Sequence, residues 1–147
     1  DDAQLRAQAV TAAADAEVAV VCIGLPATHE SEGFDRTTLS IPEVQLALIE
    51  ALAATGTPLV IVLSSGGVVD LSRIQPHAAA LVYGGLLGQA GGSAVANLLI
   101  GAANFSAKLT ETIPLRLEDS PSFPTFPGRD GISVYGESVF VGYRGFD

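Results

Sequence analysis

Ionisable side chains crowd into one short stretch of the sequence, HESEGFDR at residues 29–36, where five of eight residues are Asp, Glu, Arg or His. Hydrolysis of a glycosidic bond uses two carboxyl groups, one to protonate the leaving oxygen and one to stabilise or attack the sugar. Glu30 and Glu32 are two residues apart, so in an extended loop they point to opposite sides. They are poor candidates for a complete catalytic pair. From spacing alone, solvated loop acids are a simpler interpretation than catalysis.

Other chemistries have weaker support. The run GLLGQAG at 85–91 is neither the dinucleotide fingerprint nor a P-loop, and a close strand-to-helix turn explains its glycines better. A nucleotide binder that uses Gly84–Gly92 stays as an alternative. His29 and His77 are the two imidazoles, and without His or Cys partners at ligand spacing we expect no metal site and no cofactor. No G-x-S-x-G elbow is present, so Ser64 and Ser65 are predicted to be turn residues.

The charged stretch follows an apolar run, EVAVVCIGL at 17–25, which predicts a strand covered on both faces. Open parallel sheets place their ligand sites just past the carboxyl ends of such strands. Further buried strands are predicted at 58–63 and 78–83. The single cysteine, Cys22, lies inside the first strand and is predicted to be a small buried hydrophobe.

Helical patterns alternate with these strands. Spacing predicts helices over 3–16, from about Ser40 to Ala54, and over 93–100, with a short helical turn between Val68 and Gln75. Ser40 and Glu43 have the spacing of a capping box. The repeated order predicts an α/β fold with a doubly wound, mostly parallel sheet, a flavodoxin-like sandwich.

The character of the chain changes after about residue 101. Residues 102–130 are rich in proline, with one possible edge strand between Leu109 and Leu117. Aromatic residues alternate roughly over 132–146, which predicts a hairpin or a final strand. We therefore expect a single domain over 1–147, made of a βα core at 1–101 and a wrapping arm with a terminal β segment at 102–147.

Composition excludes several classes of protein. With 48% hydrophobic and 16% charged residues the chain is too apolar to be a disordered acidic tail. Its net charge of −9 makes nucleic acid or an anionic membrane an improbable partner. No apolar segment is long enough for a membrane span. The start, Asp1-Asp2, resembles no signal peptide and lacks Met, so we expect a processed or excised piece, with the compartment open and the cytoplasm slightly favoured.

Several motifs in one order resemble family 3 glycoside hydrolases, the β-glucosidase group, over nearly the whole chain. ESEGFDR at 30–36 and VFVGYR at 139–144 carry most of this resemblance. The departures are small. Phe105 and Ala107 stand where the family's N-P-S-G-K run has Pro and Gly, and Ser138 stands where Y-G-E-G has Gly.

The resemblance implies a division of labour. In this family a barrel domain supplies an aspartate nucleophile, and a following α/β sandwich supplies the general acid/base from a loop. The Glu of the S-E-G triplet is Glu32, which would be that acid/base. Glu30, Asp35 and Arg36 would shape the loop or contact sugar hydroxyls, and His29 could bind a hydroxyl or tune a carboxyl group.

Our first hypothesis is therefore a piece of a retaining β-glycosidase that acts on a β-linked glucoside or short oligosaccharide. Its partner would be the barrel domain of the same enzyme, and the isolated chain should be inactive or nearly so. The rival hypothesis is a non-catalytic module that binds sugar or docks a protein. An exposed apolar face could also favour a homo-oligomer.

Overall fold

The computed structural model describes residues 2–146. Three helices and three strands make up its regular structure, together with short 3-10 turns. In chain order they are α1 (Asp2–Ala14), β1 (Ala19–Gly24), α2 (Glu43–Ala53), β2 (Leu59–Ser64), a 3-10 turn (Gln75–His77), β3 (Ala78–Tyr83), α3 (Gly91–Leu99) and two further 3-10 turns (Leu117–Asp119 and Gly142–Gly145).

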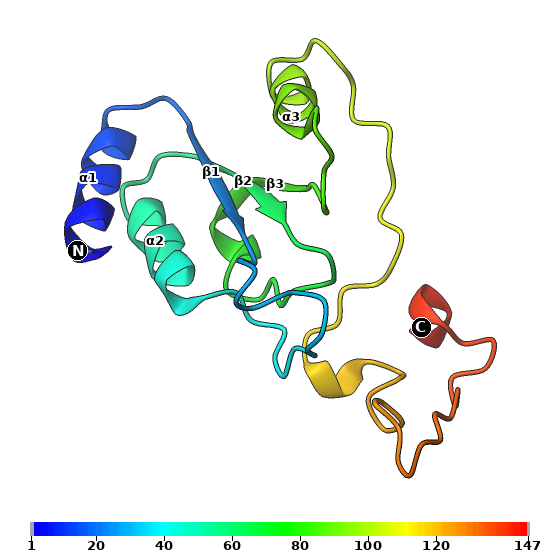
Figure 1. Ribbon diagram of the computed structural model, residues 1–147. Coiled ribbons are helices and arrows are strands. Elements are labelled where there is room, and N and C mark those ends of the chain that lie inside the picture. Colours follow the sequence, from blue (N-terminus) through cyan, green and yellow to red (C-terminus); the bar gives the residue numbers. More distant parts are fainter. Residues whose placement is uncertain (1, 147) are drawn as a thin grey trace.

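The three strands form one open parallel sheet in the order β1-β2-β3. Helices α1 and α2 lie on one side of this sheet and α3 lies on the other (Figure 1). The α/β class and the parallel sheet predicted from the sequence are thereby confirmed. A helical turn was expected between Val68 and Gln75, but the 3-10 turn spans Gln75–His77 and overlaps that segment only at Gln75.

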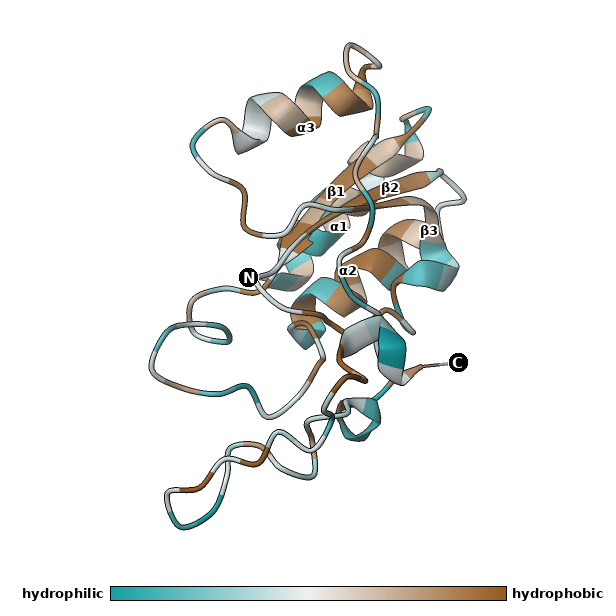
Figure 2. Cartoon of the chain, turned by 90° about the vertical axis from the view of Figure 1, so that its right-hand side faces the viewer, coloured by the Kyte–Doolittle hydropathy of each residue, from teal (hydrophilic) through white to brown (hydrophobic). Residues whose placement is uncertain are grey.

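The hydrophobic core fills the space between α1, α2 and one face of the sheet. The side chains of Ile49 in α2 and Ile61 in β2 are fully buried there. The strands and α2 contribute most of the other core residues, namely Val21, Ile23, Leu46, Leu52, Leu59 and Leu63. In Figure 2 the strands carry mostly the hydrophobic colours, whereas α1 and α2 carry a mixture of hydrophobic and hydrophilic ones. Burial of this apolar surface is the main force that holds the layers together.

Among the described residues, the other face of the sheet is open at β1. Val20 and Cys22 on β1 are exposed, whereas Val21 and Ile23 between them are buried. The prediction of a strand covered on both faces with a buried thiol is therefore wrong for β1. The reason is that α3 has no buried residue of its own and does not cover this part of the sheet.

Helix α2 starts differently from the predicted capping box. Its N-cap is Pro42, and no side chain caps the first turn. The Glu43 carboxylate instead accepts two hydrogen bonds from Arg73, at 2.8 and 3.0 Å, and Arg73 also binds Glu50. These bonds hold the pKa of Glu43 below its usual value. Glu43 thus ties α2 to the segment before β3 rather than to its own N-terminus.

The C-terminal part of the chain extends away from the sheet in both views (Figures 1 and 2). Neither the edge strand predicted within 109–117 nor a strand within 132–146 forms in the described residues. The one pairing in the latter region is an isolated bridge between Arg129 and Ile132. An isolated hairpin is marginal in water, and this segment does not lie along a sheet edge that could extend it. Alternation of aromatic residues was therefore not sufficient to form a strand.

Replacing Ile49 with Ala should lower the free energy of unfolding by about 2–5 kcal/mol, because the cavity lies in the fully buried core. Val44 on the same helix is 49% exposed, and Val44→Ala should change it by about 0.5 kcal/mol or less. Urea unfolding followed by circular dichroism measures both. Equal losses in the two variants would contradict this placement of the core.

Candidate active site

The charged stretch lies where β1 ends and meets the loop that follows β2. In the parallel register Gly24 pairs with Ser64, so both strands end at the same level. A Cβ at Gly24 would collide with the carbonyl oxygen of Ser64, so glycine is required for this close approach. The side-chain amide of Gln45 in α2 accepts from Gly24 N–H at 3.0 Å and donates to Gly24 C=O at 2.9 Å. The base of the loop is thereby fixed to both β2 and α2.

Glu30 reaches across from this loop to the loop after β2. Its Oε2 accepts the N–H of Gly66 at 2.6 Å, and its Oε1 accepts the N–H of Gly67 at 3.0 Å. Arg36 lies beside it, with Nε 3.8 Å from Glu30 Oε1, and donates from Nη2 to the carbonyl of Val68 at 2.8 Å. The structure therefore brings Glu30 and Arg36 together as one cluster, which binds backbone groups that follow β2.

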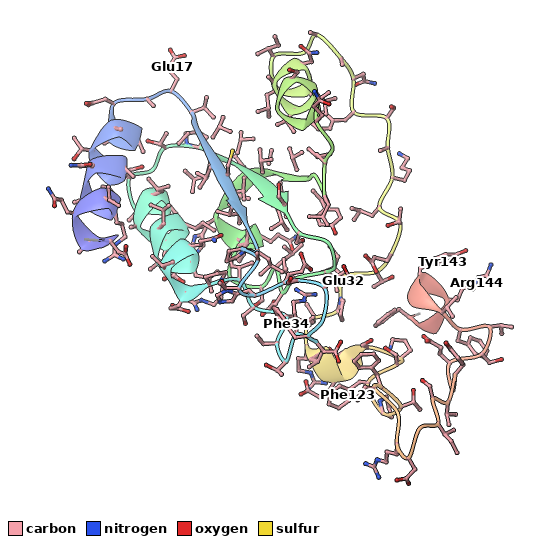
Figure 3. All side chains as sticks on the ribbon, in the orientation of Figure 1. Glu17, Glu32, Phe34, Phe123, Tyr143 and Arg144 are labelled. Carbon is pink, nitrogen blue, oxygen red and sulfur yellow. The ribbon has the colours of Figure 1, made fainter. Side chains whose placement is uncertain are left out.

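Glu32 lies between these two anchored residues and differs from both. It is exposed, and within residues 2–146 its carboxylate has no ion pair or hydrogen bond. The next residue, Gly33, has φ +96°, a conformation that side-chain-bearing residues rarely adopt, so the chain turns sharply at this point. Figure 3 shows Glu32 at the carboxyl end of the sheet, with Glu17 at the opposite end of β1. Its carboxylate is available to a ligand.

His29 and Asp35 line a small hollow beside the same loop, together with Phe34 and Thr38. The His29 ring lies 3.1 Å from the Thr28 hydroxyl. Asp35 is exposed, and its carboxylate makes no ion pair or hydrogen bond in the part of the chain that the structure describes. Both side chains are open to solvent.

Comparison with known proteins identifies the family of this chain. Residues 2–143 match the family model described as the glycosyl hydrolase family 3 C-terminal domain. The chain belongs to this family.

Two curated relatives and one solved structure illustrate the similarity. The chain is 43% identical to an exo-α-(1→6)-L-arabinopyranosidase of Bifidobacterium breve over 146 residues, which cover 99% of this chain and 19% of the relative. It is 47% identical to thermostable β-glucosidase B of Acetivibrio thermocellus, with the same coverage. A crystal structure of a family 3 β-glucosidase from Bifidobacterium adolescentis superimposes with a TM-score of 0.92 at 46% identity, covering 98% of this chain and 21% of that one. The chain thus spans about a fifth of the length of these relatives.

Sequence reasoning missed the groups of this family 3 domain that hold the charged loop. They are the N–H groups of Gly66 and Gly67, the carbonyl of Val68, and the amide of Gln45. One signal was present, since the run SSGG at 64–67 ends a buried strand at the same sheet edge. Small residues there leave backbone N–H groups accessible to a carboxylate.

The glycine-rich run at 84–92 acts as a tight connection between β3 and α3. Gly84 donates its N–H to the carbonyl of Leu63, and Gly85 has φ +63°. The Leu87 side chain packs so closely on Gly91 that a Cβ there would lie 2.6 Å from it. These contacts support the turn interpretation over a phosphate loop.

Two features are absent from the described residues. No group of three or more His, Cys, Asp or Glu side chains gathers closely enough to hold a metal ion within residues 2–146. No helix in that range has the length and apolar character needed to cross a membrane.

Replacing Gln45 with Ala should lower the free energy of unfolding by about 1–3 kcal/mol, because the part-buried N–H and C=O of Gly24 would both lose their partner. Gln8 on α1 is an exposed helix glutamine, and Gln8→Ala should be neutral or slightly stabilising. Chemical unfolding of the three proteins measures the difference. A Gln45→Ala variant as stable as Gln8→Ala would show that the two hydrogen bonds between Gln45 and Gly24 contribute nothing to the free energy of unfolding.

Proposed function

We propose that this chain is the part of a retaining β-glycosidase that carries the general acid/base loop, with Glu32 as the acid/base. Glu32 would donate its proton to the leaving oxygen as the glycosidic bond breaks and a sugar–carboxylate bond forms. Its carboxylate would then take a proton from the water that attacks the anomeric carbon, which releases the sugar. The second carboxylate would come from the barrel domain that the family resemblance implies.

The contrast between Glu30 and Glu32 is the observation that carries this proposal. Both belong to the ESEGFDR motif at the carboxyl end of β1, but both carboxylate oxygens of Glu30 already accept hydrogen bonds from backbone N–H groups. Glu32 is exposed and free of partners in the described range, so it is the carboxyl group that can meet a substrate. In this proposal one catalytic carboxylate belongs to this chain and the other lies outside it. This agrees with the sequence argument that Glu30 and Glu32 do not form a catalytic pair.

We propose a β-linked glucoside or short oligosaccharide as the substrate. Support comes from the A. thermocellus relative at 47% identity and the B. adolescentis structure at 46% identity, which are both named β-glucosidases. One relative is named for α-(1→6)-L-arabinopyranoside cleavage, so a pentopyranoside is the second candidate. His29 and Asp35 are proposed to bind sugar hydroxyls, because both are open to solvent beside the Glu32 loop.

A non-catalytic docking module is the alternative function. It is favoured by the open sheet face at Val20 and Cys22, where apolar side chains are exposed. Titration with glucose separates the two functions, because a docking module should give no NMR shifts within residues 29–36.

Glu32→Gln should cut turnover of glucosides with poor leaving groups by about 100- to 10,000-fold, because general acid catalysis contributes that much. Substrates with good leaving groups should lose less in bond cleavage, and azide should rescue them by replacing the base-assisted attack of water. The assay uses a chimera in which this chain replaces the matching 147 residues of the A. thermocellus β-glucosidase, which it resembles at 47% identity.

Glu17→Gln is the matched control in the same chimera. Glu17 is also an exposed acid next to β1, but it lies at the opposite end of the strand (Figure 3). Its removal should leave turnover within about twofold, as expected for a surface change far from the chemistry. If Glu32→Gln behaved like Glu17→Gln, Glu32 would not be the acid/base.

A further inference from the structure

We infer that Glu30 is a positioning residue, which mounts the Glu32 loop on the loop that follows β2. This inference rests on the proposed role of Glu32. Glu30 Oε2 accepts Gly66 N–H at 2.6 Å and Oε1 accepts Gly67 N–H at 3.0 Å, so one carboxylate binds two successive backbone donors. Such charge-assisted bonds are shorter and stronger than neutral ones. The two bonds join Glu30 to residues that lie 36 and 37 positions further along the sequence.

The two glycines make this approach possible. A Cβ at Gly66 would lie 3.2 Å from Glu30 Oε2, and a Cβ at Gly67 would lie 3.0 Å from Arg36 Nη2. Neither glycine has a positive φ, so close approach rather than backbone conformation is the reason for glycine here. The SSGG run therefore forms a cradle for a carboxylate.

Arg36 closes the cluster from the other side. Its Nη2 donates to Val68 C=O at 2.8 Å and its Nε faces Glu30 Oε1 at 3.8 Å. Its Nη1 is buried away from solvent and has no hydrogen-bond partner among the described residues. The Glu30 and Arg36 side chains are only 22% and 20% exposed. Both are turned toward the protein, which favours loop shaping over direct contact with sugar.

The cluster leaves a short free segment that contains Glu32. Glu30 N–H is also bonded to Pro26 C=O at 3.0 Å, so the chain is held up to residue 30. Arg36 holds it again, and only Ser31–Asp35 lie between the two anchors. Five exposed residues with both ends fixed can sample far fewer positions than the whole loop. Loss of the Glu30 anchor should therefore displace Glu32 from its productive position.

The kinetic test is a double-mutant cycle of Glu30→Gln and Glu32→Gln in the chimera described above. With Glu32 present, Glu30→Gln should lower kcat for a poor-leaving-group glucoside by about 100-fold, the cost of a displacement of roughly 1 Å, with little change in KM. With Glu32→Gln present, the same change should cost less than about twofold, because nothing remains to be positioned. Glu17→Gln is again the unaffected control.

Different outcomes separate the two proposals. An equal loss in both backgrounds, or a rise in KM alone, would show that Glu30 contacts the sugar and would overturn the positioning role. If Glu32→Gln had no effect, the proposed function and the positioning role would both fall. If Glu30→Gln failed to fold, Gly66→Ala would replace it, since its Cβ would lie 3.2 Å from Glu30 Oε2 and crowd that carboxylate, and it should shift kcat in the same direction.

A structural measurement tests the contact itself without any activity. Amide hydrogen exchange at Gly66 and Gly67 should become faster in Glu30→Gln than in the parent chain, because the amide side chain offers one acceptor for two donors. Glu17→Gln should leave both rates unchanged. Unchanged exchange in Glu30→Gln would overturn the anchor, whatever the kinetics show.

Discussion

The parallel pairing of β1 with β2 is the constraint on which the site depends. Gly24 pairs with Ser64, and the space between them leaves no room for a Cβ on Gly24. Two loops that are far apart in sequence therefore start side by side. A slip of the register by one residue would turn the side chains of β1 to the other face and separate Glu30 from the glycines that bind it.

Regular elements could be predicted from the sequence because their causes are local. Runs of β-branched residues such as PLVIVL at 58–63 become strands, and the apolar stripe after Pro42 becomes α2. The spacing of apolar residues shows which face of a helix or strand is buried, and this spacing is visible in a single sequence. The position of the charged stretch at the end of β1 followed from the same patterns.

Contacts between distant residues could not be predicted in this way. Spacing of Ser40 and Glu43 suggested a capping box, but Arg73, 30 residues further on, offers Glu43 a charged partner. In the same way, the two acids of the ESEG motif look equivalent in sequence, and only the loop after β2 makes them different. Cys22 looked buried because the apolar run is continuous, whereas exposure depends on what covers each face of the sheet.

The difference between Glu30 and Glu32 has a chemical consequence. Both oxygens of Glu30 are bonded to backbone N–H groups, which suits an anchor that holds the loop in place. A general acid must instead hold a proton near neutral pH, which requires burial or a neighbouring negative charge. Glu32 is exposed in the described part of the chain, so this chain alone does not bury it. If Glu32 is the acid/base, the proposed barrel domain must supply that environment as well as the nucleophile. Packing of the loop against the barrel would then bring the two catalytic carboxyl groups together and give Glu32 the surroundings that an acid needs.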